Sequence, residues 1–492
     1  MTTIITDPEQ WYADYEEASV KQQYDLFLEA ISQPLTPEII EDLDLGMLLV
    51  MIRDELVNHN QIDQALDLIQ TIQEKQPDLY QQEFPFLENL RLEYALYRNN
   101  IDEARQALQP FLANPTEDID QTLAILDYLV FSDAVDLAID LAQAAYTPVE
   151  AADNVVLGTE IEFGEVLLQH QLQQAYTQLK AGEPIDWQAF LAEAMTHGLS
   201  KKSKWVEEVQ HYLAEPIAAT PDFFTLFKRD RNKALRALAV AFCQDMADQK
   251  QFSFVCSHAM WGVMCEFLED RNLPQKKLSQ PDLYFYFTQP QLDPYAAQKI
   301  GNLLSMQQTI GVGLVWSIPY IYDWLLAKQF IQPAVHQQAI EVATALKADF
   351  TNGYEQLWRY DFVHRWQRPD SVTVADFEAE AKQFADKLAE VTPLSDEAGH
   401  GTTRAFMEGL AQMLPPEARQ QLEGMSEAEL MALLREEDED LQDEDDEIPF
   451  HSSSRTFDAY QPAKPRKSPL QLAAELPDRK NKPSNKKKKR GF

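Results

Sequence analysis

Three cysteines and one histidine are the residues closest to a metal-binding pattern in this chain. The cysteines are Cys243, Cys256 and Cys265, and His258 lies between the last two. Structural zinc sites use thiolates in close pairs such as Cys-x-x-Cys, and no such pair is present here. The surrounding residues are apolar and follow a helical pattern, where buried cysteines are common. We therefore expect three buried free thiols, no metal site and no disulfide framework.

Sequence motifs for catalysis are missing as well. The chain has no phosphate-binding loop, no Gly-x-Ser-x-Gly elbow and no His-Glu-x-x-His helix. His400 sits between two glycines, next to two threonines and Arg404, but nothing is spaced to activate it, so a linker explains this segment. Catalytic triads assemble from distant positions, so an enzyme site among the aromatic residues of about 217–367 stays an alternative to a packed aromatic core. The expectation is a non-catalytic protein with no cofactor.

A short phrase, Ile/Val-Asp-x-Ala, recurs three times in the first third of the chain. Its copies begin at Ile62, Ile101 and Val135, with spacings of 39 and 34 residues (101 minus 62, 135 minus 101). Spacings of this size are typical of stacked helical hairpins.

Each phrase continues with apolar residues four and then three positions further on, followed by a proline. The sets are Ala65, Ile69, Ile72 and Pro77; Ala104, Leu108, Phe111 and Pro115; Ala138, Ala142, Ala145 and Pro148. These steps place the residues on one face of a helix, and the proline is expected to end that helix because it supplies no amide donor. The residues expected to pack repeat against repeat are Ala65, Ile69, Ala104, Leu108, Ala138 and Ala142.

This pattern resembles the second helix of a tetratricopeptide repeat, over about residues 45–150. The resemblance implies a solenoid of helical hairpins with a groove for a peptide or helix. Glycine makes up 15 of 492 residues, about 3 % where about 7 % is usual, and alternating strand patterns are almost absent. We predict an all-α protein that begins with helical repeats in 1–150. Residues 151–395 are expected to form an aromatic-rich helical domain or, as the alternative, to continue the solenoid. A short helical hairpin in 396–435 and a disordered tail in 436–492 are expected to follow.

Charge is segregated along the chain. Overall, 42 basic residues face 80 acidic ones, a net charge of −38, yet residues 448–492 hold 12 basic and 3 acidic residues. Residues 436–447 carry ten carboxylates in twelve positions, a composition that stays solvated. A basic cluster ends the tail: Lys486, Lys487, Lys488, Lys489 and Arg490. This cluster is suited to contact RNA or another anionic surface, to serve as a nuclear address, or simply to keep the end soluble.

A local basic patch in residues 228–236 interrupts the mainly acidic part of the chain that precedes residue 448. We expect it to pair with carboxylates of an adjacent hairpin, with an anion site as the alternative.

No secretory signal opens the sequence, and one apolar stretch, residues 310–327, approaches membrane length. Pro319 and Asp323 within it favour a buried helix over a membrane span. The expected location is the cytoplasm, with the nucleus as the alternative in a eukaryotic host.

The predicted function is a non-catalytic scaffold that binds a peptide or helix of an unknown protein partner in a helical-repeat groove. The alternative is a nucleic-acid- or ribosome-associated factor that uses the lysine-rich tail. Salt separates the two: binding of RNA through the tail should fall steeply with salt and vanish when residues 480–492 are removed, whereas groove binding should not.

Overall fold

The computed structural model describes residue 5 and residues 8–200, 204–215, 217–271, 273, 278–300, 307–354 and 356–395. Every regular element in these ranges is a helix, so the predicted all-α class is confirmed. The predicted hairpin of 396–435, the tail of 436–492 with Lys486 to Arg490, and His400 lie outside the described residues.

The helices fall into three stretches of the chain. The first is α1 (Pro8–Glu17), α2 (Val20–Ile31), α3 (Pro37–Asp42), α4 (Leu45–Asn58), α5 (Ile62–Lys75), α6 (Pro77–Tyr97), α7 (Ile101–Ala113), α8 (Ile119–Phe131) and α9 (Val135–Ala151). The second is α10 (Glu160–Ala181), α11 (Trp187–Thr196), α12 (Trp205–Ala214), α13 (Pro221–Arg229), α14 (Arg231–Gln249) and α15 (Phe254–Asp270). The third is α16 (Pro281–Phe285), α17 (Gln289–Ile300), α18 (Gln308–Ala327), α19 (Pro333–Gly353), the 3₁₀ helix η2 (Leu357–Tyr360), α20 (Phe362–Arg365) and α21 (Val374–Ala389).

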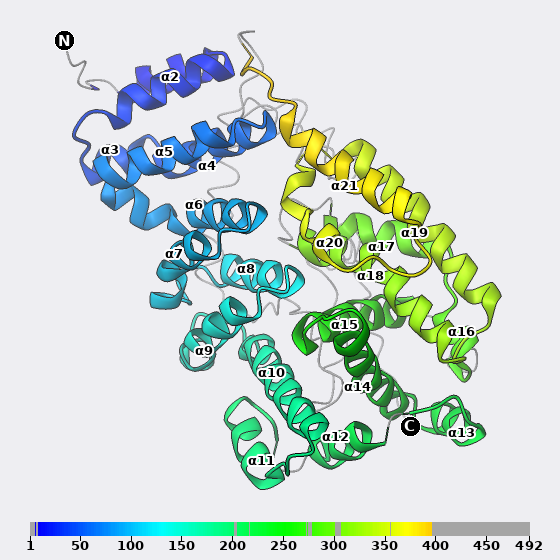
Figure 1. The fold of residues 1–492 in the computed structure, drawn as a ribbon. Helices are drawn as coiled ribbons and strands as arrows, with labels where there is room; N and C mark the ends of the chain where they lie inside the picture. The colour runs from blue at the N-terminus through cyan, green and yellow to red at the C-terminus, as the bar shows by residue number, and fades with distance from the viewer. Residues whose placement is uncertain are drawn as a thin grey trace, which may run out of the picture.

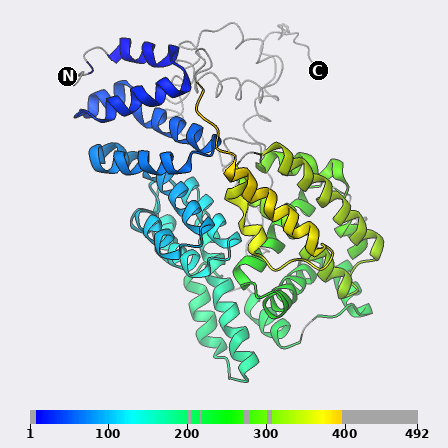
Figure 2. The ribbon, with the colours of Figure 1, turned by 45° about the horizontal axis from the view of Figure 1, so that its top comes forward.

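The chain runs away from its N-terminal helices and then returns to them. In Figure 1 the helices descend on one side from α2 to α10, turn at α11 and α12, and climb back on the other side through α14 and α15 to α19. Helix α21, in yellow, points back to the blue N-terminal helices in both Figure 1 and Figure 2. The two ends of the described chain therefore meet.

The buried core does not divide at residue 150. One large apolar cluster extends from Phe84 on α6 to Phe384 on α21. A second cluster holds the N-terminal helices together and also contains Trp358 and Leu394 from the returning end of the chain. A third joins α10, α11, α12 and α14.

The three copies of the phrase begin three helices, as predicted. Helices α5, α7 and α9 start at Ile62, Ile101 and Val135. Pro77 and Pro115 follow the ends of α5 and α7, but the prediction that Pro148 ends its helix is wrong, because α9 continues to Ala151. A proline in the last turn removes only one hydrogen bond near a helix end, where carbonyl groups are unpaired in any case.

The helix before each phrase ends in the same way. Two residues before the phrase lies Asn60, Asn99 or Asp133, with φ of 55°, 56° and 54°. The next amide donates to a carbonyl five residues back, for example from Gln61 to Leu56 at 2.7 Å, which is the Schellman closure. Asparagine and aspartate tolerate this left-handed backbone better than other non-glycine residues. This turn chemistry is how the helical hairpins form with so little glycine.

Asp133 also connects its turn to α15. Its carboxylate accepts hydrogen bonds from the amide and the hydroxyl of Ser253, the residue that caps the first turn of α15. Burial raises the pKa of Asp133 to about 6, although the bonds from Ser253 oppose the shift.

The pKa of Asp133 makes stability depend on pH. Between about pH 4 and pH 6 the folded protein keeps a proton that the unfolded chain has released, so the free energy of unfolding falls as pH rises, by up to about 3 kcal/mol. The Asp133→Asn variant should lack this slope and be more stable above pH 6. Urea unfolding followed by circular dichroism from pH 4 to pH 7 checks this, with exposed Asp136→Asn as control. An unchanged slope in Asp133→Asn would contradict the assignment.

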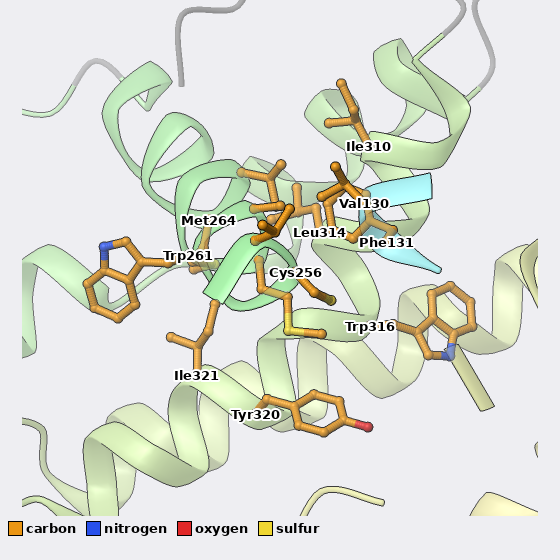
Figure 3. Close-up of a cluster of buried hydrophobic side chains, with 14 of the residues drawn as sticks. Val130, Phe131, Cys256, Trp261, Met264, Ile310, Leu314, Trp316, Tyr320 and Ile321 are labelled. Carbon is orange, nitrogen blue, oxygen red and sulfur yellow. The ribbon is translucent and has the colours of Figure 1, made fainter. Parts of the chain in front are cut away.

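Helix α18 lies at the centre of the largest core. Among the described helices it alone is long and apolar enough to cross a membrane, and 83 % of its most apolar window is buried within the protein. It packs against α8, α15, α17 and α19. Figure 3 shows Leu314 of α18 beside Val130 and Phe131 of α8. The prediction of buried thiols is confirmed, since all three cysteines are free and buried.

Candidate functional site

The six residues predicted to pack repeat against repeat lie on α5, α7 and α9, the second helices of three successive hairpins. All six are completely buried: Ala65, Ile69, Ala104, Leu108, Ala138 and Ala142. The small alanines allow close contact between α7 and its neighbours α6 and α9. These residues hold the hairpins together and do not reach a surface where a partner would bind.

The inner face of the N-terminal helices is the side of α4, α6 and α8 that faces the returning end of the chain. Trp358 of η2 is completely buried on this face. Its indole meets the rings of Tyr94 and Tyr97 edge-on, with centroid distances of 5.5 and 5.7 Å. Phe362 of α20 packs in the same way on Tyr128 of α8, at 5.5 Å. Aromatic side chains of the protein itself therefore fill the middle of the inner face.

Polar side chains also hold η2 and α20 against α6. Arg359 makes a two-point contact with Glu93 of α6, from Nε at 2.7 Å and Nη2 at 2.6 Å. Arg365 donates to the carbonyls of Leu96 and Tyr97 at 2.5 and 2.7 Å, where α6 ends. A cation at a helix C-terminus pairs with carbonyls that lack partners within the helix.

A second segment, the C-terminal strap of residues 387–395, lies across the turn between α4 and α5. The side-chain amide of Asn60 donates to the carbonyls of Lys387 and Glu390, at 2.9 and 3.1 Å. The amide of Gln61 donates to the carbonyl of Thr392 at 2.7 Å. Both amides thus bind main-chain atoms of the strap.

The backbone of this turn takes part as well. The amide of Thr392 donates to the carbonyl of His59 at 3.1 Å, and the hydroxyl of Thr392 lies 2.7 Å from Nδ1 of His59. Further along, the amide of Lys21 on α2 donates to the carbonyl of Ser395 at 3.2 Å. The strap therefore has two parts: residues 387–389 are the last turn of α21, and residues 391–395 have no helical structure.

Only some strap side chains enter the protein. Leu394 is 8 % exposed and belongs to the N-terminal core, whereas Val391, three residues earlier, is 62 % exposed. Leu388 also packs against this core, from the last turn of α21. The strap is thus held by two leucine side chains, by the Thr392 hydroxyl and by its main chain.

The N-terminal helices are strongly acidic. Residues 1–150 contain 6 basic and 30 acidic residues, a net charge of −24. The exposed acids include the aspartate of each phrase, namely Asp63, Asp102 and Asp136. In the first turn of α5, α7 and α9 these carboxylates interact favourably with the helix dipole. The exposed surface of the N-terminal helices is therefore negatively charged.

The residues that could do chemistry are placed in the core. Burial raises the pKa of Cys243, Cys256 and Cys265, which disfavours the reactive thiolate. The aromatic residues of the middle region, such as Trp316 and Tyr320, are buried, as expected for a packed aromatic core. Among the described residues no cluster of histidine, cysteine, aspartate or glutamate is arranged to hold a metal.

The strap site was not visible in the sequence. Its central residues, His59 to Gln61, directly precede the first phrase, and Asn60 carries the signal of a left-handed turn. Nothing local connects that turn with residues more than 325 positions later, because such a contact depends on how the whole chain returns.

Comparison of the chain with protein-family models, with curated proteins and with solved structures gives no match.

Proposed function

We propose that this protein is a non-catalytic interaction scaffold whose N-terminal hairpins, α4 to α9, form a tetratricopeptide-like solenoid that binds an extended segment of another protein. In this proposal the C-terminal strap occupies the site in the absence of a partner. The partner segment then competes with the strap for the same turn.

The proposal is supported by the way the strap is bound. In the non-helical part, Gln61 donates to the carbonyl of Thr392 and the amide of Thr392 donates to the carbonyl of His59, main-chain contacts that accept many different sequences. Asn60 donates to the carbonyls of Lys387 and Glu390 at the end of α21. Specificity would come from the apolar position of Leu394 and from the negative charge of the surrounding helices, which favours a partner with basic residues near the bound segment.

The experiment compares two strap variants of the full chain. Leu394→Asp places a charge in the apolar position and should release the strap, whereas Val391→Asp puts the same charge at an exposed position. A fluorescent peptide of residues 385–397 should bind Leu394→Asp at least about 10-fold more tightly than the wild type or Val391→Asp, measured by anisotropy. Circular dichroism confirms that each variant is folded.

Two outcomes would contradict the proposal. If the peptide binds no variant saturably, the turn does not accept an extended chain in trans. If wild type and Leu394→Asp bind equally, the strap does not compete for the site.

The tail gives the second candidate, a nucleic-acid- or ribosome-associated factor, because 12 of the basic residues are gathered in residues 448–492. Five cations at 486–490 give an expected salt slope of roughly 3–4 in log affinity for single-stranded RNA. RNA binding with this slope, lost on removal of residues 480–492, would favour the second candidate over the scaffold.

A further inference from the structure

Helix α21, whose last turn begins the strap, is held on the protein at few points. Phe384 is the one described side chain of α21 that is fully buried, and its ring packs on Trp316 of α18 with the centroids 5.9 Å apart. Glu380, one turn earlier, accepts a hydrogen bond from the Trp316 indole at 2.7 Å. A helix with so few buried side chains opens more easily than a helix of the core.

His364 of α20 lies at the centre of these contacts. Its Nε2 is 3.0 Å from Oε1 of Glu380. Its ring meets the rings of Phe384 and Phe377 edge-on, with centroid distances of 4.4 and 5.6 Å. The His364 side chain is only 4 % exposed, so little water reaches it. One buried histidine thus contacts three side chains of α21.

Two carboxylates face His364 from different elements. On the side of α21 this is Glu380, which also lies 3.8 Å from the ammonium group of Lys347 on α19. On the other side Oδ1 of Asp361 is 3.6 Å from Nδ1 of His364, and Asp361 also lies 3.8 Å from Nε of Arg365. A positive charge on His364 is therefore attracted from both of its ring nitrogens.

Histidine is the side chain that normally changes its charge near neutral pH, which distinguishes this cluster from another one on α12 and α14. There Glu208 pairs with Arg236 at 3.0 Å and with Lys233 at 3.3 Å, as predicted for the basic patch. That set of three contains no histidine, so the cluster around His364 is the better candidate for a response to pH.

The protonation of His364 is coupled to the position of α21. Burial disfavours its charge, but the interactions with Asp361 and Glu380 outweigh burial and raise the pKa of His364. Burial also opposes the charge of Glu380, yet His364 and Lys347 lower the pKa of this carboxylate, which stays ionised at neutral pH. The contribution of His364 is therefore complete below about pH 6.5, the pKa of a free histidine, and is lost as pH rises through the raised pKa.

We propose that His364 is a pH-dependent latch for α21: when charged it holds the helix and the strap on the protein, and when neutral it allows both to detach. This regulation of the strap site rests on the proposed function, because a partner segment can reach the turn at Asn60 only when the strap is released. Binding of a partner is thus favoured above neutral pH.

Hydrogen exchange of the full chain, followed by mass spectrometry, measures the opening of α21 directly. The protection of residues 374–389, corrected for the pH dependence of chemical exchange, should fall at least about 3-fold from pH 6 to pH 8.5, whereas that of α14 should not change. His364→Gln keeps a donor near Glu380 but takes up no proton, so its protection should not depend on pH. The control is His211→Gln on α12, a change at a histidine that is 60 % exposed, and it should behave as the wild type.

Three outcomes would overturn the proposal. The first is equal protection of α21 at pH 6 and pH 8.5 in the wild type. The second is a pH slope that persists in His364→Gln, which still contains His59, the histidine that contacts the strap. If circular dichroism shows that His364→Gln is unfolded, Glu380→Gln takes its place and should reduce the slope, and the third outcome is an unchanged slope in this variant. The measurement uses no peptide, so its result is independent of whether a partner competes with the strap.

Discussion

Replacing Trp358 with alanine is expected to lower the free energy of unfolding by about 3–5 kcal/mol, the usual loss for a large aromatic residue removed from a core. Trp358 is completely buried between Tyr94 and Tyr97, and it contributes to the N-terminal core from the returning end of the chain. Its removal leaves a cavity in the middle of the inner face. Urea unfolding followed by circular dichroism measures the loss.

The conservative variant separates packing from other effects. The indole nitrogen of Trp358 has no hydrogen-bond partner among the described residues, so Trp358→Phe keeps most ring contacts and removes an unpaired polar group. We expect Trp358→Phe to lose less than half of what Trp358→Ala loses. Equal losses in the two variants would show that the indole has a specific polar role that the contacts do not explain.

The second large effect is expected at the ion pair between Arg359 and Glu93. The two side chains are 22 % and 13 % exposed, so little water reaches the pair. Arg359→Met would leave the Glu93 carboxylate mostly buried without its cation, and we expect a loss of about 3 kcal/mol near pH 7. Urea unfolding of the single variants and of the double variant Arg359→Met, Glu93→Leu gives the coupling energy.

The double variant tests the cause of the loss. Because two packed apolar groups need no counter-charge, the double variant should recover most of the lost stability. A loss that persists in the double variant would assign the effect to packing of the arginine stem.

The helical class and the start of three helices could be predicted because they depend on local patterns. Ile62, Ile101 and Val135 begin helices since the apolar spacing and the aspartate in the first turn act within a few residues. The burial of the cysteines followed from their apolar neighbours. Pro148 shows the limit of a local rule, because packing continued a helix for three residues past a proline.

The strap site could not be predicted from the sequence in this way. Asn60 and Glu390 lie 330 positions apart (390 minus 60). Both residues look ordinary in their own segments. The path of the whole chain, not any motif, brings them together.

The return of the chain to its own beginning has a consequence for synthesis. Tyr97 and its cover Trp358 are separated by 261 residues (358 minus 97), so α6 leaves the ribosome long before the residues that bury its inner face exist. At about 5–20 residues per second, this face stays open for roughly 15–50 s in every newly made molecule. During that interval the apolar and tyrosine side chains of α4 and α6 are accessible to chaperones and to other nascent chains. The inner face is buried only when the last helices have been synthesised.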